Sequence, residues 1–226
     1  MTNEATGTPA NGAELDQLET RVLAVLAEKE ALTPDNYPMS LNAIVNGCNQ
    51  VSSRDPIMQL TDDTVQDTLQ RLIERKLVSA ISQAGARVVK YEHRMRIKWT
   101  LEQDKVAVLS ILMLRGLQTA GEIRTRTGRM HEFKSVQDVE TTLQFLIDKY
   151  PPLVVRLDRA AGTKEPRYGH LLAGEISATY EAPSSGAALG GGGASRVGQL
   201  EQEVAALRGE LEDLKAQFEA FRQQFQ

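Results

Sequence analysis

The chain has 226 residues, of which 41% are hydrophobic and 25% charged, and its formal net charge is -4. These values are typical of a globular protein with one or two domains, and they exclude the strongly basic balance of a dedicated nucleic-acid coat protein. The single cysteine, Cys48, excludes an internal disulfide framework. Three scattered histidines give no zinc-binding spacing, so we expect neither a metal nor a cofactor.

The sequence contains no signal for export or for membrane insertion. Residues 1–14 lack the basic start and the apolar core of a signal peptide, and no run of about 18 apolar residues occurs. We therefore expect a cytoplasmic location, no membrane partner and a disordered N-terminus at residues 1–12.

Residues 13–99 show the element order of a winged helix, in which three helices precede a two-stranded hairpin. Apolar residues recur at helical spacing in the first and third helices, and Ser40 and Thr61 are expected to cap the second and third. Residues 94–99 are interpreted as an extension of the hairpin, or wing. The predicted elements are helices at 15–32, 41–48 and 62–76 and strands at 77–82 and 87–93.

The same order recurs at residues 100–180, which indicates an internal repeat. Thr61 corresponds to Ser135, and LQRLI at 69–73 corresponds to LQFLI at 143–147, all at one constant offset. The second set of predicted elements comprises helices at 101–116, 119–128 and 135–150 and strands at 151–159 and 166–173. The predicted fold is therefore α+β, mainly α, with two tandem winged-helix (helix-turn-helix) domains.

The C-terminal part is predicted to be a flexible linker at 181–195, rich in Gly, Ala and Ser, and a coiled-coil helix at 196–226. Pairing of Glu203 with Arg208 and of Glu210 with Lys215 favours a parallel homodimer. The alternatives are a tail that folds back on its own domains or docks on another protein. The seam alternates spacings of three and four: Val197, Leu200, Val204, Leu207, Leu211, Leu214, Phe218, Phe221 and Phe225.

Basic residues gather around the first hairpin and the short second helix of the second copy. If they share one face, they form a cationic strip that binds phosphates; otherwise they are solvated charges paired with neighbouring glutamates. Both third helices begin with carboxylates, which repel phosphates and favour a protein partner over DNA. The candidate nucleic-acid residues are Arg87, Lys90, Arg94, Arg96, Lys98, Arg124, Arg126 and Arg129.

Another candidate site is a polar cluster in residues 37–58. Cys48 lies in a mostly apolar short helix and is expected to be buried, and Arg54 with Asp55 is interpreted as a structural ion pair or a cap. The cluster either braces a long loop through side-chain to backbone hydrogen bonds or presents a recognition surface. Its members are Asn42, Asn46, Asn49, Gln50, Ser53, Arg54 and Asp55.

The motif TPD-YP-SLNA-CNQ-S-RDP-M, which runs through residues 33–58, resembles the signature of the YceH family of bacterial proteins, whose function is uncharacterised. The resemblance extends over roughly residues 14–173. It implies a tandem winged-helix fold and a bacterial cytoplasmic location, and it transfers no catalytic or binding residues.

The sequence thus favours a non-enzymatic adaptor or regulator that dimerises through its C-terminal helix. In this hypothesis it binds a protein partner, either alone or together with DNA. The alternative is a DNA-binding transcriptional regulator that uses the basic strip. An enzyme with a site around residues 42–55 is the outside alternative.

Overall fold

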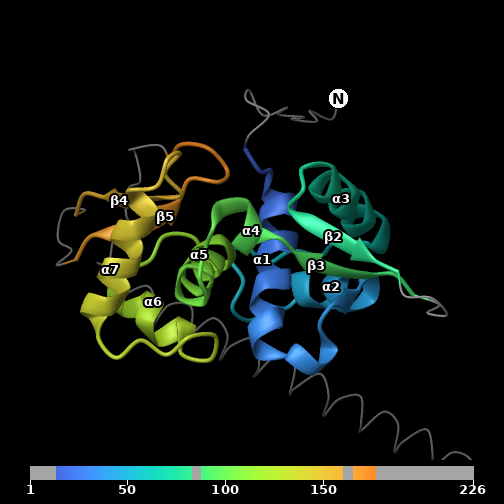
Figure 1. Ribbon diagram of the computed structural model, residues 1–226, viewed down its shortest axis with the longest axis horizontal. Helices are drawn as coiled ribbons and strands as arrows, with labels where there is room; N and C mark the ends of the chain where they lie inside the picture. The colour runs from blue at the N-terminus through green and yellow to red at the C-terminus, as the bar shows by residue number, and fades with distance from the viewer. Residues whose placement is uncertain (1–13, 83–87, 160–164, 177–226) are drawn as a thin grey trace, which may run out of the picture. The chain divides into compact units, whose positions relative to one another are not determined.

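The computed structural model describes residues 14–82, 88–159 and 165–176 (Figure 1). Within these ranges the chain combines α-helices with two small antiparallel sheets, which confirms the α+β class with helices in the majority. None of the helices in these ranges has the length and apolar character that a membrane span needs. The predicted N-terminal segment, linker and coiled coil lie outside the described residues.

The first half of the described chain contains three main helices and a three-stranded sheet of order β1-β3-β2. The predicted N-caps are confirmed, because Ser40 Oγ accepts from the Ala43 N–H at 3.4 Å and Thr61 Oγ1 accepts from the Thr64 N–H at 3.3 Å. The elements are α1 (Gln17–Leu32), the 3₁₀ turn η1 (Pro34–Asn36), β1 (Met39–Ser40), α2 (Leu41–Cys48), α3 (Asp62–Glu74), β2 (Val78–Ile81) and β3 (Lys90–His93).

Two features of this half differ from the prediction. β1 adds a third strand to the hairpin, where Met39 pairs with Tyr91, and it is too short to leave a periodic pattern in the sequence. Residues 94–99 do not extend the wing but form helix α4 (Met95–Trp99). The Arg94 N–H donates to the Leu77 carbonyl at 2.7 Å, and the chain then turns at once into the helix, which ends at Thr100 with φ of 52°.

The second half repeats the order of three helices and a hairpin. Ser135 caps its third helix as predicted, since its Oγ accepts from the Asp138 N–H at 3.2 Å while the Asp138 carboxylate accepts from the Ser135 N–H at 2.9 Å. That helix ends three residues before the predicted Tyr150. The elements are α5 (Gln103–Arg115), α6 (Ala120–Thr127), α7 (Val136–Ile147), β4 (Val154–Leu157) and β5 (Arg167–His170).

One continuous hydrophobic core runs through both halves. α1 packs along α5 in the middle of Figure 1, and both helices are buried over most of their length rather than along one stripe. α2 also approaches α1 closely, because a Cβ atom added at Gly47 would lie 2.6 Å from Val25 Cγ1. The polar cluster of the sequence therefore lies beside α1, a helix that is buried over most of its length.

Candidate functional site

The polar cluster becomes a loop between α2 and α3, residues 49–60, which we call the signature loop. Its centre is Arg54, whose side chain is buried. The guanidinium binds the Glu28 carboxylate of α1 with both terminal nitrogens, at 3.1 and 2.6 Å, and its Nε donates to the Gly47 carbonyl at 3.1 Å. The predicted structural ion pair thus exists, but its acidic partner is Glu28 rather than Asp55.

Every donor of Arg54 has an acceptor. Besides its bonds to Glu28 and Gly47, Nη1 donates to the Ser53 carbonyl at 2.9 Å and Nη2 donates to Gln50 Oε1 at 2.7 Å. A guanidinium carries five N–H groups, and these contacts use all five. A buried charge is tolerated when it is paired and fully hydrogen-bonded, so Arg54 anchors the middle of the loop.

A second buried arginine, Arg21 on α1, holds both ends of the segment. Its Nη1 donates to the Cys48 carbonyl at 3.1 Å and its Nη2 to the Pro56 carbonyl at 2.6 Å. Burial lowers the pKa of Arg21 from its usual value, and the positive charge of Arg54 lowers the pKa further. Two guanidiniums placed so close together fix the loop backbone at four carbonyl groups, those of Gly47, Cys48, Ser53 and Pro56.

Asn42, Asn46 and Asn49 were all predicted to bind the backbone of the neighbouring loops. Asn49 alone does so, because its side chain donates to the Leu60 carbonyl at 2.8 Å and accepts from the Leu60 N–H at 2.7 Å. Asn46 donates to Asn42 Oδ1 at 3.0 Å on the exposed surface of α2. Asn49 therefore closes the loop, and the other two form a local pair.

The signature loop also contacts the second half of the chain. The Asp55 N–H donates to the Leu114 carbonyl at 2.8 Å, near the end of α5, and the Arg115 side chain donates to the Ser53 hydroxyl. Since Arg54 and Arg21 bind the same loop to α1, the loop joins α1 to the C-terminal end of α5.

The outer surface of the loop is open to solvent although its backbone is held. Val51 is 77% exposed and Ile57 is 59% exposed, and Asp55 and Pro56 between them are exposed as well. Apolar side chains on a fixed backbone are suited to binding another protein, because little conformational entropy is lost when the surface is covered.

Cys48 is buried as predicted. Burial raises the pKa of its thiol to about 12, so the thiol stays protonated at neutral pH. Within the described ranges, no group of three or more histidine, cysteine or acidic side chains has a geometry that would hold a metal ion.

Two of the basic candidates near the first hairpin, Arg94 and Arg96, are engaged inside the chain. Arg94 Nε donates to the Ser79 hydroxyl at 2.5 Å, and Arg96 Nη2 lies 3.1 Å from Glu30 Oε2 and also donates to the Gln103 side chain. Lys90 and Lys98 are exposed, and their side chains make no hydrogen bond or ion pair with the described residues. Arg87 lies outside those residues.

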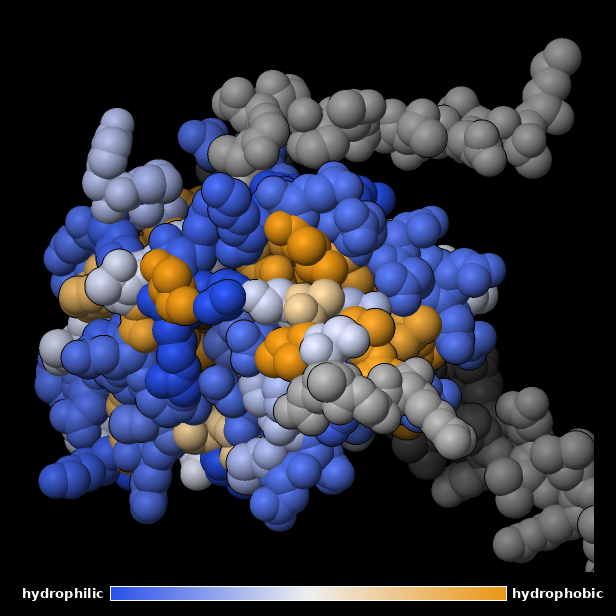
Figure 2. Space-filling model, turned by 45° about the vertical axis from the view of Figure 1, so that its right-hand side comes forward, coloured by the Kyte–Doolittle hydropathy of each residue, from blue (hydrophilic) through white to orange (hydrophobic). Residues whose placement is uncertain are grey.

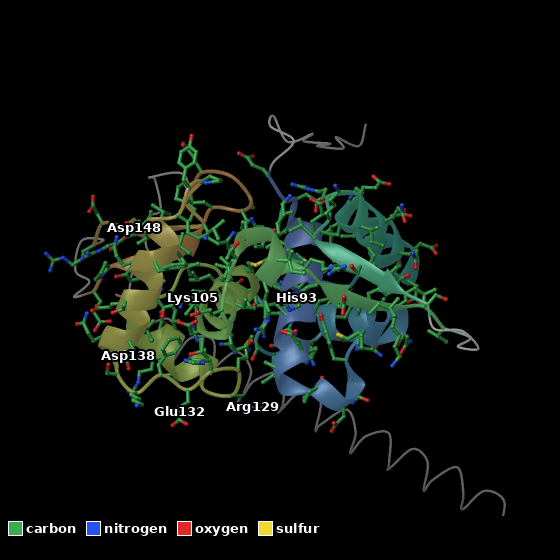
Figure 3. All side chains as sticks on the ribbon, viewed as in Figure 1. His93, Lys105, Arg129, Glu132, Asp138 and Asp148 are labelled. Carbon is green, nitrogen blue, oxygen red and sulfur yellow. The ribbon has the colours of Figure 1, made fainter. Side chains whose placement is uncertain are left out.

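The candidates in the second half follow the same pattern. Arg124 donates to the Phe133 carbonyl at 3.2 Å and to the Lys134 carbonyl at 3.0 Å, which ties α6 to the segment before α7. Arg126 donates to Gln118 Oε1 at 2.7 Å and lies 3.6 Å from Glu122. Arg129, just after α6 (Figure 3), is exposed and forms no such contact with the described part of the chain.

A buried His–Glu pair near Arg96 was not predicted from the sequence. His93 Nε2 lies 3.1 Å from Glu30 Oε2, and His93 Nδ1 accepts from the Met95 N–H at 3.2 Å. The hydrogen bond from His93 is the main reason that the pKa of Glu30 falls to about 2. Glu30 and His93 are 63 positions apart, so no local pattern reveals the pair. Both ring nitrogens are engaged, and Glu30 also pairs with Arg96, whose side chain stays exposed.

The exposed faces of both third helices are acidic. α3 exposes Asp62, Asp63 and Asp67 in its first half. α7 exposes Asp138 near its start, and Asp148 follows its end; both side chains are labelled in Figure 3. These are the helices that a DNA-binding winged helix would place in the major groove, where carboxylates face phosphates.

Apolar side chains reach the surface outside the signature loop as well. Figure 2 shows them as separate patches among hydrophilic residues on one face of the molecule. A scattered arrangement of this kind is normal for a monomer surface, and only patches with a defined shape or neighbouring charge indicate a binding site. The exposed residues are Val88, Val89, Ile97, Val136, Phe145 and Tyr150.

These features describe a mixed α+β protein in which a braced, exposed loop joins two halves with a common core. A model of a protein family of unknown function, DUF480, matches residues 15–163. The chain is 61% identical to a UPF0502 protein of Janthinobacterium sp. (strain Marseille) over the full length of both chains, and 62% identical to one of Herminiimonas arsenicoxydans over 95% of this chain and 92% of that protein. The chain belongs to this DUF480/UPF0502 family of uncharacterised bacterial proteins, which confirms the family predicted from the signature motif.

A more distant relative supports the same membership. A UPF0502 protein of Vibrio parahaemolyticus is 46% identical over 92% of this chain and 97% of its own length. The matched family has no stated activity. A function therefore has to be inferred from the signature loop and the surfaces around it.

Proposed function

We propose that the chain is a protein-binding adaptor that uses the signature loop, residues 49–60, as its recognition surface. In this proposal each half is a winged helix used for protein contact, and the C-terminal segment 196–226 makes a dimer. The observation that carries the proposal is the exposed pair Val51 and Ile57 on a backbone fixed by the buried guanidiniums of Arg21 and Arg54.

The distribution of charge supports a protein partner over DNA. Four of the nominated arginines donate to oxygen atoms of the chain itself, so phosphates would have to compete with bonds already made. The carboxylates of α3 and α7 would repel the phosphate backbone. A protein partner with basic or apolar side chains does not need these arginines, and the carboxylates do not repel it.

The experiment compares proteins captured by the full chain and by two matched variants. Ile57→Asp places a charge on the exposed loop, and Val136→Asp places the same charge at the first residue of α7, where a helix N-terminus accepts it. Each tagged chain is incubated with a native cell lysate, and bound proteins are quantified by mass spectrometry. We expect a specific set of proteins with the wild type and Val136→Asp, reduced at least about tenfold with Ile57→Asp, because burying a charge in an interface costs at least about 1.4 kcal/mol.

Equal recovery with all three chains would contradict the use of the loop. If the captured proteins disappear after nuclease treatment, direct protein binding is contradicted, and a nucleic acid that bridges them to the chain is indicated instead.

A further inference from the structure

Two hollows meet between α4 and α7. The larger has a volume of about 720 Å³ and is lined by apolar side chains that include Leu77, Trp99 and Leu153. The smaller, of about 340 Å³, is lined by Leu101 and Phe145 among others. Thr100 lines both. We call the two hollows together the α4–α7 groove. The walls come from both halves of the described chain, and the volume of each hollow falls in the range of ligand pockets.

The rim of the groove carries rigid, exposed side chains. Tyr150 is 99% exposed, and Pro151 and Pro152 follow it along the wall. Trp99 is half-buried and packs on the core with one side. Tyrosine and tryptophan supply large contact areas at low conformational cost, and they are enriched where protein interfaces have their strongest contacts.

The charge at the groove is positive and incompletely balanced. Lys98 and Lys149 line the larger hollow, and neither forms an ion pair with any carboxylate of the described residues. Lys149 Nζ lies 5.2 Å from the centre of the Phe145 ring, at the boundary with the smaller hollow. Glu14 also lines the larger hollow, where its carboxylate packs against Gly174.

The other cations at the groove already have acidic partners. Lys105 Nζ lies 2.7 Å from Glu102 Oε2, and Arg75 Nη1 lies 2.7 Å from Glu19 Oε2. This contrast identifies Lys98 and Lys149 as the positions where a ligand can supply the missing negative charge.

We propose that the α4–α7 groove binds an extended acidic peptide segment of a partner protein, with an apolar side chain beside Trp99 and carboxylates at Lys98 and Lys149. This inference rests on the proposed adaptor function and states the chemistry of the partner at a second surface. Peptide is favoured over nucleic acid because the walls between the two lysines are leucine, proline and aromatic side chains. These walls match apolar side chains and offer few donors to phosphates.

The test is a selection of random displayed peptides on the full chain, followed by fluorescence anisotropy of synthetic copies of those enriched. We expect enriched peptides to contain several Asp or Glu residues around one or two large apolar residues. Lys98→Glu combined with Lys149→Glu should weaken their binding at least about tenfold, because like charges then face each other. Tyr150→Ala should weaken it several-fold without affecting the fold, since that side chain is almost fully exposed.

The control is Lys90→Glu, which makes one such charge reversal at an exposed lysine of β3 that does not line the groove and is compared with Lys98→Glu and Lys149→Glu made singly. Its affinity for the peptides should equal that of the wild type. Circular dichroism melts of each variant verify that the fold is retained.

Three results would overturn the groove assignment: no enrichment of acidic, apolar peptides, equal binding by the double charge reversal, or tighter groove-dependent binding of a single-stranded oligonucleotide than of any peptide. None of these depends on the signature loop. The adaptor proposal is decided separately by the proteins that Ile57→Asp fails to capture.

Discussion

At the scale of single residues, the signature loop depends on two buried arginines whose roles are only partly visible in the sequence. A structural function for Arg54 is predicted from its position in a turn before a proline. Its partner Glu28 is 26 positions away, and nothing local links the two. The N-caps at Ser40 and Thr61 are predicted correctly because a cap bonds to a backbone group three residues on, within the reach of sequence patterns.

Removing the Arg54 guanidinium should destabilise the fold strongly. Arg54→Met removes the bidentate guanidinium and leaves the buried Glu28 carboxylate with Lys29 alone, whose Nζ lies 3.4 Å away, so we expect a loss of about 3 kcal/mol in the free energy of unfolding. Urea denaturation followed by circular dichroism measures this loss. The control is Arg71→Met, which removes an exposed ion pair with Asp16 and a longer contact of 3.7 Å with Glu19; it should cost no more than about 1 kcal/mol, because Glu19 keeps its ion pair with Arg75.

A double variant separates the charge from the packing. Adding Glu28→Leu to Arg54→Met should recover part of the stability, because the buried carboxylate that has lost its guanidinium is then gone. Two results would show that the ion pair between Arg54 and Glu28 does not anchor the loop. One is an equal loss of unfolding free energy in Arg54→Met and Arg71→Met, and the other is a double variant less stable than Arg54→Met.

At the scale of elements, the prediction succeeds where a pattern is long and local. The three helices and the hairpin of each half are found because their apolar residues recur regularly over many positions. β1 has two residues and depends on its partner strand, so it has no signal of its own. α4 was mistaken for wing because its five residues are basic and apolar in alternation, a pattern that a strand also shows.

The acidic faces of α3 and α7 give a prediction for DNA. We expect no saturable binding of a random-sequence duplex at a salt concentration of about 150 mM, because only Lys90, Lys98 and Arg129 among the candidate residues in the described ranges are exposed without a side-chain partner, and the carboxylates of α3 and α7 oppose them. Fluorescence anisotropy of a labelled duplex at low and physiological salt measures this. Tight binding that is lost when Arg124, Arg126 and Arg129 are changed to Glu would instead favour the DNA-binding regulator.

For the described chain taken together, the structure shows that the two halves pack on each other through α1 and α5, which the internal repeat in the sequence does not predict. The internal repeat predicts two similar sets of elements, and both are found. The packing of α1 on α5 was not predicted. However, both helices are apolar nearly all round, as RVLAVLA at 21–27 and VAVLSILML at 106–114 show, and such helices need cover on more than one side.

The seam at 197–225 predicts the oligomeric state. Full-length chain should have the mass of a dimer in light scattering, and a chain ending at Glu181 should have the mass of a monomer, because the apolar seam and its Glu-to-Arg and Glu-to-Lys pairs are then missing. Equal monomeric masses would exclude the coiled-coil dimer. A dimer in both chains would place the contact within residues 1–181.

The shared core has a consequence for how the protein is made. α1 leaves the ribosome first, and the helix that covers it, α5, ends 83 residues after Leu32. At a synthesis rate of about 5–20 residues per second, this interval lasts for several seconds, during which one apolar side of α1 has no partner. We therefore expect the nascent first half to expose this apolar side of α1 until the second half arrives, and the signature loop can form its hydrogen bond to Leu114 only then.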